Sequence, residues 1–332
     1  MSLPRFVFLV HPLTFNQRRV VGVRTLQWGL YGSRHGREFQ AGRICMLEMP
    51  GVAQGEVISI PWMPSELIED QSAAVEAMSQ VVDRLEDVRA VGLGSLLAVV
   101  GSRGEALAER TDVPITSGAA ATTWAAMKNT IRVLEATGET SVGLVGFSGT
   151  VGEALGAALA KAGVEVWVGA KGKAVARRAE SLGLKHASIE EAVRGRRVVL
   201  GAGTTGAILE PSMLEPHSIL LDVALPSSLK KGKRPVGLQI FAAEAMDLPE
   251  GWKRGFWGRL YHLLAGYGPS QIYACLAEPM VMAAQGRTEP FAQGRRLALE
   301  SVYAFGEAAE ELGLNARLAR GWSGVNPDRL VR

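Results

Sequence analysis

Cysteine is scarce in this chain, which has only Cys45 and Cys275 among its 332 residues. The two lie far apart, and neither has further ligand-type residues around it at a metal-binding spacing. We therefore expect neither a disulfide framework nor a metal site. So little cysteine fits a reducing compartment, and the predicted location is the cytoplasm.

Strong net charge and long apolar runs are missing as well. The net charge is +3, which is too small to indicate a nucleic-acid partner. The apolar opening stretch FVFLV is shorter than the core of a signal peptide, and no apolar run approaches the length of a membrane span. With 47% hydrophobic and 21% charged residues, the composition is that of a soluble globular protein. The length favours two domains over one.

The stretch SVGLVGFSGTVGEALGAALAKAG, residues 141–163, carries the clearest structural signal in the chain. A short apolar strand is followed by Gly146, Gly149 and Gly152, and then by apolar residues at helical spacing. Such glycines let the chain reverse, let its backbone approach a pyrophosphate, and let helix and strand pack closely. The N-terminus of the helix then offers free N–H groups to the phosphates. The spacing is looser than G-x-G-x-x-G, and tight packing without a nucleotide is the other interpretation.

A second strand, VEVWV at 164–168, follows this helix and completes a βαβ unit of the length of a mononucleotide-binding half. NAD-specific sites usually have an acid at the end of that strand, whereas this chain has Ala170, Lys171 and Lys173 nearby. Positive charge at this place suits a 2′-phosphate, so the predicted cofactor is NADP(H). The alternative is that these basic residues form a solvated helix face.

Strands and helices go on alternating after residue 168, which predicts a parallel, doubly wound sheet of the Rossmann type. The fold class is α/β, with a second α/β substrate domain and C-terminal helices. The predicted division is a substrate domain at 1–137, an NADP(H)-binding domain at 138–268, and helices at 269–332 that pack back on the first domain. Two glycine-rich strand ends complete the cofactor site, which is predicted to comprise Gly146, Ser148, Gly149, Thr150, Val151, Gly152, Ala170, Lys171, Lys173, Ala202, Gly203 and Thr204.

A helix is predicted over 271–285, with Ser270 as its N-cap and Pro279 as a bend. Cys275 lies in the second turn of this helix, where the helix dipole would favour a thiolate. Its position alone favours a structural cysteine, because Cys275 belongs to an apolar stripe of the helix. A last helix is predicted over 293–312.

The segment SQIYACLAEPMVMAAQG at 270–286 resembles the C-terminal region of the long-chain fatty acyl-[acyl-carrier-protein] reductases, which form fatty aldehydes. The stretches HPLT at 11–14, TSG at 116–118 and GFSGTVG at 146–152 occur in the same order as in that family. The resemblance implies that the Cys275 thiolate attacks an acyl thioester and that hydride from NADPH then releases the aldehyde.

The same resemblance implies two more catalytic residues and several partners. Glu278 lies on the same helix face as Cys275, and Asn129 corresponds to a glutamine of the family. An asparagine and a histidine of the family are replaced by Ala119 and Ala121. The implied partners are a fatty acyl thioester, carried by acyl-carrier protein or CoA, and an aldehyde-consuming enzyme. An acidic carrier protein could meet the basic loop from Lys230 to Arg234, which otherwise is a solvated loop.

Two other functions fit the same residues. One is an NADP-linked dehydrogenase of the shikimate-dehydrogenase type, in which Cys275 belongs to the core and Lys128 is the candidate catalytic residue. The other is a protein that binds NADP(H) or acyl chains without catalysis. The sequence predicts neither the acyl chain length nor the oligomeric state.

Overall fold

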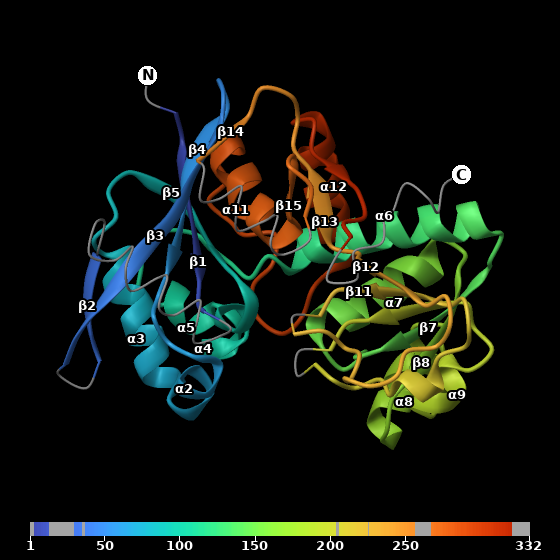
Figure 1. Ribbon diagram of the computed structural model, residues 1–332. Coiled ribbons are helices and arrows are strands. Elements are labelled where there is room, and N and C mark those ends of the chain that lie inside the picture. The colour runs from blue at the N-terminus through green and yellow to red at the C-terminus, as the bar shows by residue number, and fades with distance from the viewer. Residues whose placement is uncertain are drawn as a thin grey trace.

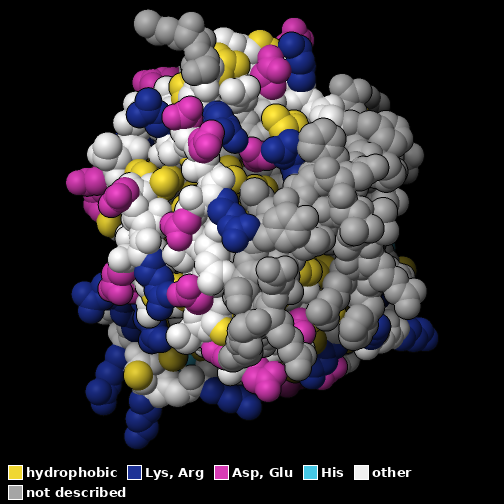
Figure 2. Space-filling view, turned by 90° about the vertical axis from the view of Figure 1, so that its left-hand side faces the viewer, with side chains coloured by type: hydrophobic (Ala, Val, Ile, Leu, Met, Phe, Trp, Pro, Cys, Tyr) yellow, Lys and Arg dark blue, Asp and Glu magenta, His cyan; other side chains and the backbone are white. Residues whose placement is uncertain are grey.

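The computed structural model describes residues 3–12, 30–34, 37–203, 206–224, 226–255 and 267–320, with the backbone alone described at 30–34 and 37–40. Two β-sheets stand side by side, and the long helix α6 (Ala119–Thr137) runs from one toward the other (Figure 1). No helix of the described part is both long enough and apolar enough to cross a membrane. Basic and acidic side chains occur next to one another on the face seen in Figure 2.

The first sheet is built around two buried parallel strands, and its faces are set by the alternation of side chains along each strand. Val7 and Leu9 pack toward α3 (Gln71–Val82), whereas Phe6 and Phe8 pack toward α11 (Ala274–Gln285). The strands lie in the order β14 (Lys253–Arg254), β3 (Arg37–Met49), β4 (Ala53–Ser59), β1 (Arg5–Val10), β5 (Val88–Leu93) and β6 (Ile115–Thr116), and β2 (Leu30–Arg34) pairs with β3. Short helical segments cover the α3 side, namely α2 (Pro64–Glu69), η1 (Ser95–Ala98), α4 (Val100–Arg103) and α5 (Glu105–Ala108).

The second sheet is parallel throughout and confirms the predicted Rossmann-type fold. Its strands lie in the order β9 (Lys185–Ala187), β8 (Glu165–Gly169), β7 (Ser141–Val145), β10 (Val198–Gly201), β11 (Ile219–Asp222) and β12 (Gln239–Ala242). This is the doubly wound order in which the strand sequence reverses between β7 and β10, and ligands bind in the crevice at such a reversal. The connecting helices are α7 (Thr150–Lys161), α8 (Lys173–Ser181) and α9 (Ile189–Val193), followed by the short η2 (Pro211–Met213).

After β12 the chain returns to the first sheet. Strand β13 (Ala245–Asp247) forms a small antiparallel sheet with β15 (Gln271–Tyr273) and β16 (Asn315–Ala316), and β14 joins β3. Helix α11 packs on the face of the first sheet, where Gly92 leaves room for Pro279: a Cβ on Gly92 would lie 2.5 Å from Cγ of the proline. Helix α12 (Leu299–Glu311) packs on α6.

Two predicted helix boundaries are wrong. Residues 271–273 form a strand and not the start of a helix, because β13 pairs with their backbone and Leu248 N–H donates to the Ser270 carbonyl at 2.9 Å. Cys275 is therefore in the first turn of α11 and not in the second. The last helix begins at Leu299 and not at residue 293, because Gln293 and Gly294 hydrogen-bond to the loop at 103–104.

Candidate active site

The turn between β7 and α7 requires glycine at two of its three positions. Gly146 has a φ of +87°, and a Cβ there would lie 2.4 Å from the backbone nitrogen of Gly203. A Cβ on Gly152 would lie 2.2 Å from the carbonyl oxygen of Gly146. At Gly149 the nearest atom would be 3.5 Å away, so this position is open. The result is a backbone cradle at the strand-order reversal, and the first residues of α7 line the neighbouring pocket, as in phosphate-binding turns.

The end of β8 carries positive charge and no acid. Gly172, with a φ of +102°, turns the chain into α8, and Lys171 and Lys173 on either side of it are exposed. Arg178 on α8 pairs with Glu153 of α7 at 2.6 Å, but no described acid forms an ion pair with either lysine. The arrangement fits a 2′-phosphate better than a 2′-hydroxyl, which an acid would bind.

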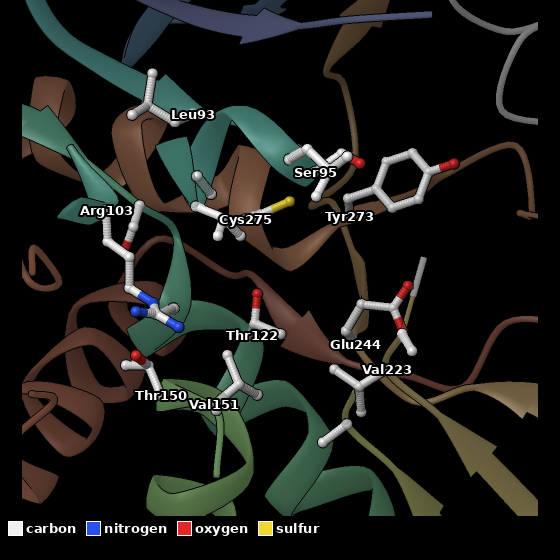
Figure 3. A pocket seen from close by; sticks show the side chains of 18 of the residues that line it. Leu93, Ser95, Arg103, Thr122, Thr150, Val151, Val223, Glu244, Tyr273 and Cys275 are labelled. Carbon is white, nitrogen blue, oxygen red and sulfur yellow. The ribbon is translucent and has the colours of Figure 1, made fainter. Parts of the chain in front are cut away.

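A pocket of about 170 Å³ opens beside the glycine turn (Figure 3). Its wall combines the carboxyl ends of β7, β10 and β11 with loops of the first sheet and with the start of α11. The predicted residues that line it are Gly149, Thr150, Val151, Ala202, Gly203 and Cys275. The predicted residues that do not line it are Gly146, Ser148, Gly152, Ala170, Lys171, Lys173, Asn129 and Glu278, while Thr204 is outside the described residues. The fold thus brings the glycine turn and Cys275 into one space.

Cys275 packs tightly at the start of α6. Gly118 has a φ of +72°, and a Cβ there would lie 2.5 Å from the Cβ of Cys275. Burial, together with the nearby carboxyl groups of Glu244 and Glu278, raises the pKa of the Cys275 thiol to about 12. Hydrogen bonding at the first turn of the helix works in the opposite direction but is the smaller effect. The thiol is therefore protonated at neutral pH, which is the wrong state for a nucleophile.

Glu278 is fully buried and joins α11 to the start of α6. Its carboxylate accepts hydrogen bonds from the Thr116 hydroxyl and, at 2.8 Å, from the backbone N–H of Ala121. Burial raises the pKa of this carboxyl to about 7 in spite of these bonds. Glu278 does not line the pocket.

Glu244, which the sequence analysis did not select, lines the pocket directly after β12. Its Oε1 accepts a hydrogen bond from the Tyr267 hydroxyl, and its buried Oε2 has no hydrogen-bond partner among the described residues. Burial, with a smaller contribution from the charge of Asp222, raises the pKa of this carboxyl to about 7. A carboxyl group with this pKa can give or take a proton near neutral pH. In the sequence, the only indication that Glu244 belongs to the site is that an acidic residue follows closely after a strand.

The two remaining predicted residues are held away from the pocket. The Asn129 side chain donates hydrogen bonds to the carbonyls of Ala243, at 2.7 Å, and Ala245, at 3.3 Å. Lys128 pairs with Glu310 of α12 at 3.2 Å and lies over the ring of Trp124. Within the described part of the chain, no group of three or more His, Cys, Asp or Glu side chains could hold a metal ion.

No protein-family model matches the chain. It is 29% identical over 282 residues to the aminotransferase PigE of Serratia sp. (strain ATCC 39006), a match that covers 78% of this chain and 32% of PigE. The chain therefore spans about a third of the length of this curated relative.

Two solved structures with bound cofactor are also similar. One is shikimate 5-dehydrogenase of Thermus thermophilus in complex with NADP(H) and shikimate, at 18% identity, with 86% of this chain and 99% of that chain covered and a TM-score of 0.35. The other is the yhdH oxidoreductase of Salmonella enterica in complex with NADP, at 15% identity, with 36% and 42% covered and a TM-score of 0.27. Because both scores are low, the fold assignment rests on this chain's own strand order.

The predicted resemblance to the long-chain fatty acyl-[acyl-carrier-protein] reductases is wrong as a family assignment. The curated relative, whose match covers 78% of this chain, is named an aminotransferase and not an acyl reductase. Two residues of the segment that suggested the resemblance, Cys275 and Glu278, have structural contacts in this fold. Cys275 packs against Gly118, and Glu278 is a buried hydrogen-bond acceptor between two elements.

Proposed function

We propose that the chain is an NADP(H)-dependent oxidoreductase that interconverts a carbonyl compound and an alcohol without a covalent enzyme intermediate. The observation that carries the proposal is the shared pocket: Gly149 and Thr150 of the glycine turn line the same space as Glu244. A cofactor turn and a titratable carboxyl group around one pocket suit a reaction that moves a hydride and a proton. The proposed domain division stays that of the sequence analysis, with 1–137 on the substrate side and 138–268 on the cofactor side.

The residues present fit the cofactor. The glycine cradle leaves its open side at Gly149, next to the N–H groups that begin α7. Lys171 and Lys173 lie at the end of β8, where a 2′-phosphate would be placed. When bound, NADP(H) supplies or accepts the hydride. The remaining chemistry belongs to the side chains of the pocket.

In the direction of reduction, the carbonyl carbon receives the hydride and the carbonyl oxygen needs a proton. The Glu244 carboxyl gives that proton and becomes a carboxylate. The Tyr267 hydroxyl stabilises the negative charge by donating a hydrogen bond to Oε1. In the direction of oxidation the carboxylate takes the proton from the alcohol. Burial of the Glu244 carboxyl maintains its raised pKa.

Two other activities have less support. Acyl-thioester reduction through Cys275 would need a thiolate, whereas the pKa of this thiol is raised to about 12. The aminotransferase name belongs to a protein of which this chain covers 32%. Aminotransferases hold their cofactor on a lysine, and none of the described residues that line the pocket is a lysine. An acyl-carrier partner has no separate support: Lys230 of the basic loop pairs with Glu210, and residues 231–234 are exposed, as in a solvated loop.

The experiment compares the wild type with Glu244→Gln. Binding of NADPH is followed by its fluorescence, and NADPH oxidation is then assayed against a set of small aldehydes and ketones. We expect the wild type to oxidise NADPH with at least one of them, and Glu244→Gln to bind NADPH normally but lose about a hundredfold or more in kcat. Glu180→Gln, an exposed change of the same kind on α8, should have no effect. A wild type that does not bind NADPH, or a Glu244→Gln variant with unchanged kcat, would overturn the proposal.

A further inference from the structure

The loop that ends α4 has an unusual backbone. Gly101, Ser102, Arg103 and Gly104 have φ values of +60°, +56°, +60° and +90°, so one complete turn is left-handed. Glycine adopts this conformation freely, but a residue with a side chain is strained there. Ser102 and Arg103 therefore hold this shape only because other contacts enforce it.

Those contacts tie the loop to a distant segment of the chain. The backbone N–H of Gly294 donates to the Arg103 carbonyl at 3.2 Å, and the Gln293 side chain donates to the Gly104 carbonyl at 3.4 Å. On the other side, Gly101 N–H donates to the Gln71 side chain at 3.4 Å. The loop at 101–104 and the segment at 293–295 thus form one unit, and Arg103 and Arg295 are its two cations.

The two arginines are brought together without a described counter-charge. Burial lowers the pKa of Arg103, and electrostatic repulsion from the charge of Arg295 lowers it further. Glu105 lies against Gly294 in the same corner, but no described acid forms an ion pair with either arginine. Only two acids, Glu38 and Asp328, have side chains outside the described part. Two like charges held together by backbone hydrogen bonds call for an anion.

The position of this pair indicates which anion. Arg103 and Thr150 both line the pocket, and Figure 3 shows the guanidinium group of Arg103 directed toward Thr150. The Thr150 hydroxyl donates a hydrogen bond to the Arg295 carbonyl at 3.0 Å. The Arg103 side chain and the backbone of Arg295 therefore lie at the N-terminus of α7, where a dinucleotide has its diphosphate.

We propose that Arg103 and Arg295 bind the diphosphate of NADP(H) from the side opposite the glycine turn. This inference rests on the proposed function and adds residues that the glycine motif does not contain. A guanidinium group can bind two phosphate oxygens at once, and the pair would neutralise charge that the N–H groups of α7 share only in part. Arg103 lies beside the first sheet, and the glycine turn belongs to the second sheet. The bound cofactor would therefore contact both parts of the molecule.

The test compares NADPH with two smaller ligands, of which one contains the diphosphate and the other does not. 2′-Phospho-ADP-ribose contains both the diphosphate and the 2′-phosphate, whereas 2′,5′-ADP lacks the diphosphate. We expect Arg103→Gln to weaken binding of NADPH and of 2′-phospho-ADP-ribose about tenfold or more, as measured by calorimetry. Binding of 2′,5′-ADP, which keeps only the adenosine-side phosphate, should weaken much less. Arg103→Lys should lose less. Arg194→Gln, which removes the same charge at the end of α9, should bind all three ligands normally.

Arg295→Gln provides a second measurement at an exposed position, in case Arg103→Gln fails to fold. It should weaken the two diphosphate ligands in the same selective way. If both variants bind these ligands as the wild type does, or lose affinity for all three equally, the inference is wrong while the proposed function stands. If the wild type itself binds no NADPH, the proposed function fails as well.

Discussion

The side-chain nitrogen of Asn129 lies 2.7 Å from the carbonyl oxygen of Ala243 and holds the backbone next to Glu244. The same nitrogen reaches the carbonyl of Ala245 at 3.3 Å, so both neighbours of Glu244 are fixed from α6. The carbonyl of Glu244 itself accepts a hydrogen bond from Ala274 N–H at 2.9 Å. The proton-transfer group of the proposed mechanism is thereby fixed between α6 and α11.

Replacing Asn129 by Ala should reduce catalysis through Glu244 and not through cofactor binding. The change leaves the buried carbonyl of Ala243 unpaired, at a cost of about 1–3 kcal/mol, and loosens the backbone of Glu244. The carbonyl of Ala245 keeps its hydrogen bond from the Arg317 N–H, at 3.0 Å. We expect kcat to fall about tenfold, with unchanged NADPH affinity. A less firmly held Glu244 is more accessible to water, which should lower the pKa of its carboxyl. In a plot of kcat against pH, the change in kcat near pH 7 should therefore move to lower pH.

Thr137→Ala is the matched control for this variant. The Thr137 hydroxyl donates to the Val133 carbonyl at 2.7 Å within the same helix, far along the chain from Asn129. Its removal should cost stability and leave the pH profile of kcat unchanged. Equal losses of kcat in both variants, without a shift of the profile, would mean that Asn129 merely supports α6.

Glu278 should make the protein less stable as the pH rises through the slightly acidic range. The pKa of this carboxyl is about 7 when folded, against an ordinary value of 4.5. Between these pH values the folded protein keeps a proton that the unfolded chain has lost, so the free energy of unfolding falls as the pH rises. The full loss is about 3 kcal/mol, since a tenfold change in proton affinity corresponds to about 1.4 kcal/mol.

The measurement is urea unfolding of the wild type and of Glu278→Gln at about pH 5 and about pH 8. The neutral glutamine cannot lose a proton, so the variant should show a smaller decrease in stability between the two pH values. Part of the decrease should remain, because the pKa of Glu244 is raised in the same direction. If the free energy of unfolding of Glu278→Gln fell as much between the two pH values as that of the wild type, the Glu278 carboxyl would already be ionised in the folded protein at about pH 5.

The local part of the site could be predicted from the sequence, and the part assembled by distant segments could not. The glycine turn is encoded within a few residues, because Gly146 and Gly152 are needed for contacts inside one βαβ unit. Glu244 acquires its raised pKa only through burial beside Asp222, which belongs to another strand. Arg103 meets Arg295 only because the loop at 101–104 and the segment at 293–295 pack together.

The error at the start of α11 has a similar origin. Ser270 followed by apolar residues at helical spacing is a reasonable helix start when the chain is considered alone. In the fold, the backbone of Gln271 and Ile272 pairs with β13 across a long sequence separation, and the helix starts at Ala274. Tertiary pairing overrides local preference here, as it commonly does for short strands.

The preference for NADP(H) over NAD(H) should depend on the two lysines at the end of β8. In the double variant Lys171→Ala, Lys173→Ala, we expect the affinity for NADPH to fall about tenfold, because the 2′-phosphate loses its cationic partners. The affinity for NADH, which lacks this phosphate, should not change. Fluorescence titration with each cofactor checks this. Lys161→Ala, at the exposed end of α7, serves as the control. Equal loss for both cofactors, or for neither, would place the 2′-phosphate elsewhere.

The Cys275 thiol should behave as an unreactive group at neutral pH. With a pKa of about 12, only a minute fraction is thiolate at pH 7. In a Cys45→Ala background, alkylation by iodoacetamide should therefore be slow and should accelerate with rising pH without reaching a plateau below about pH 10. Intact-mass spectra after incubation with a long-chain acyl-CoA should show no adduct. An alkylation rate already constant above pH 7 would contradict the raised pKa of this thiol. An acyl adduct that Cys275→Ala abolishes would indicate covalent catalysis and contradict the proposed mechanism.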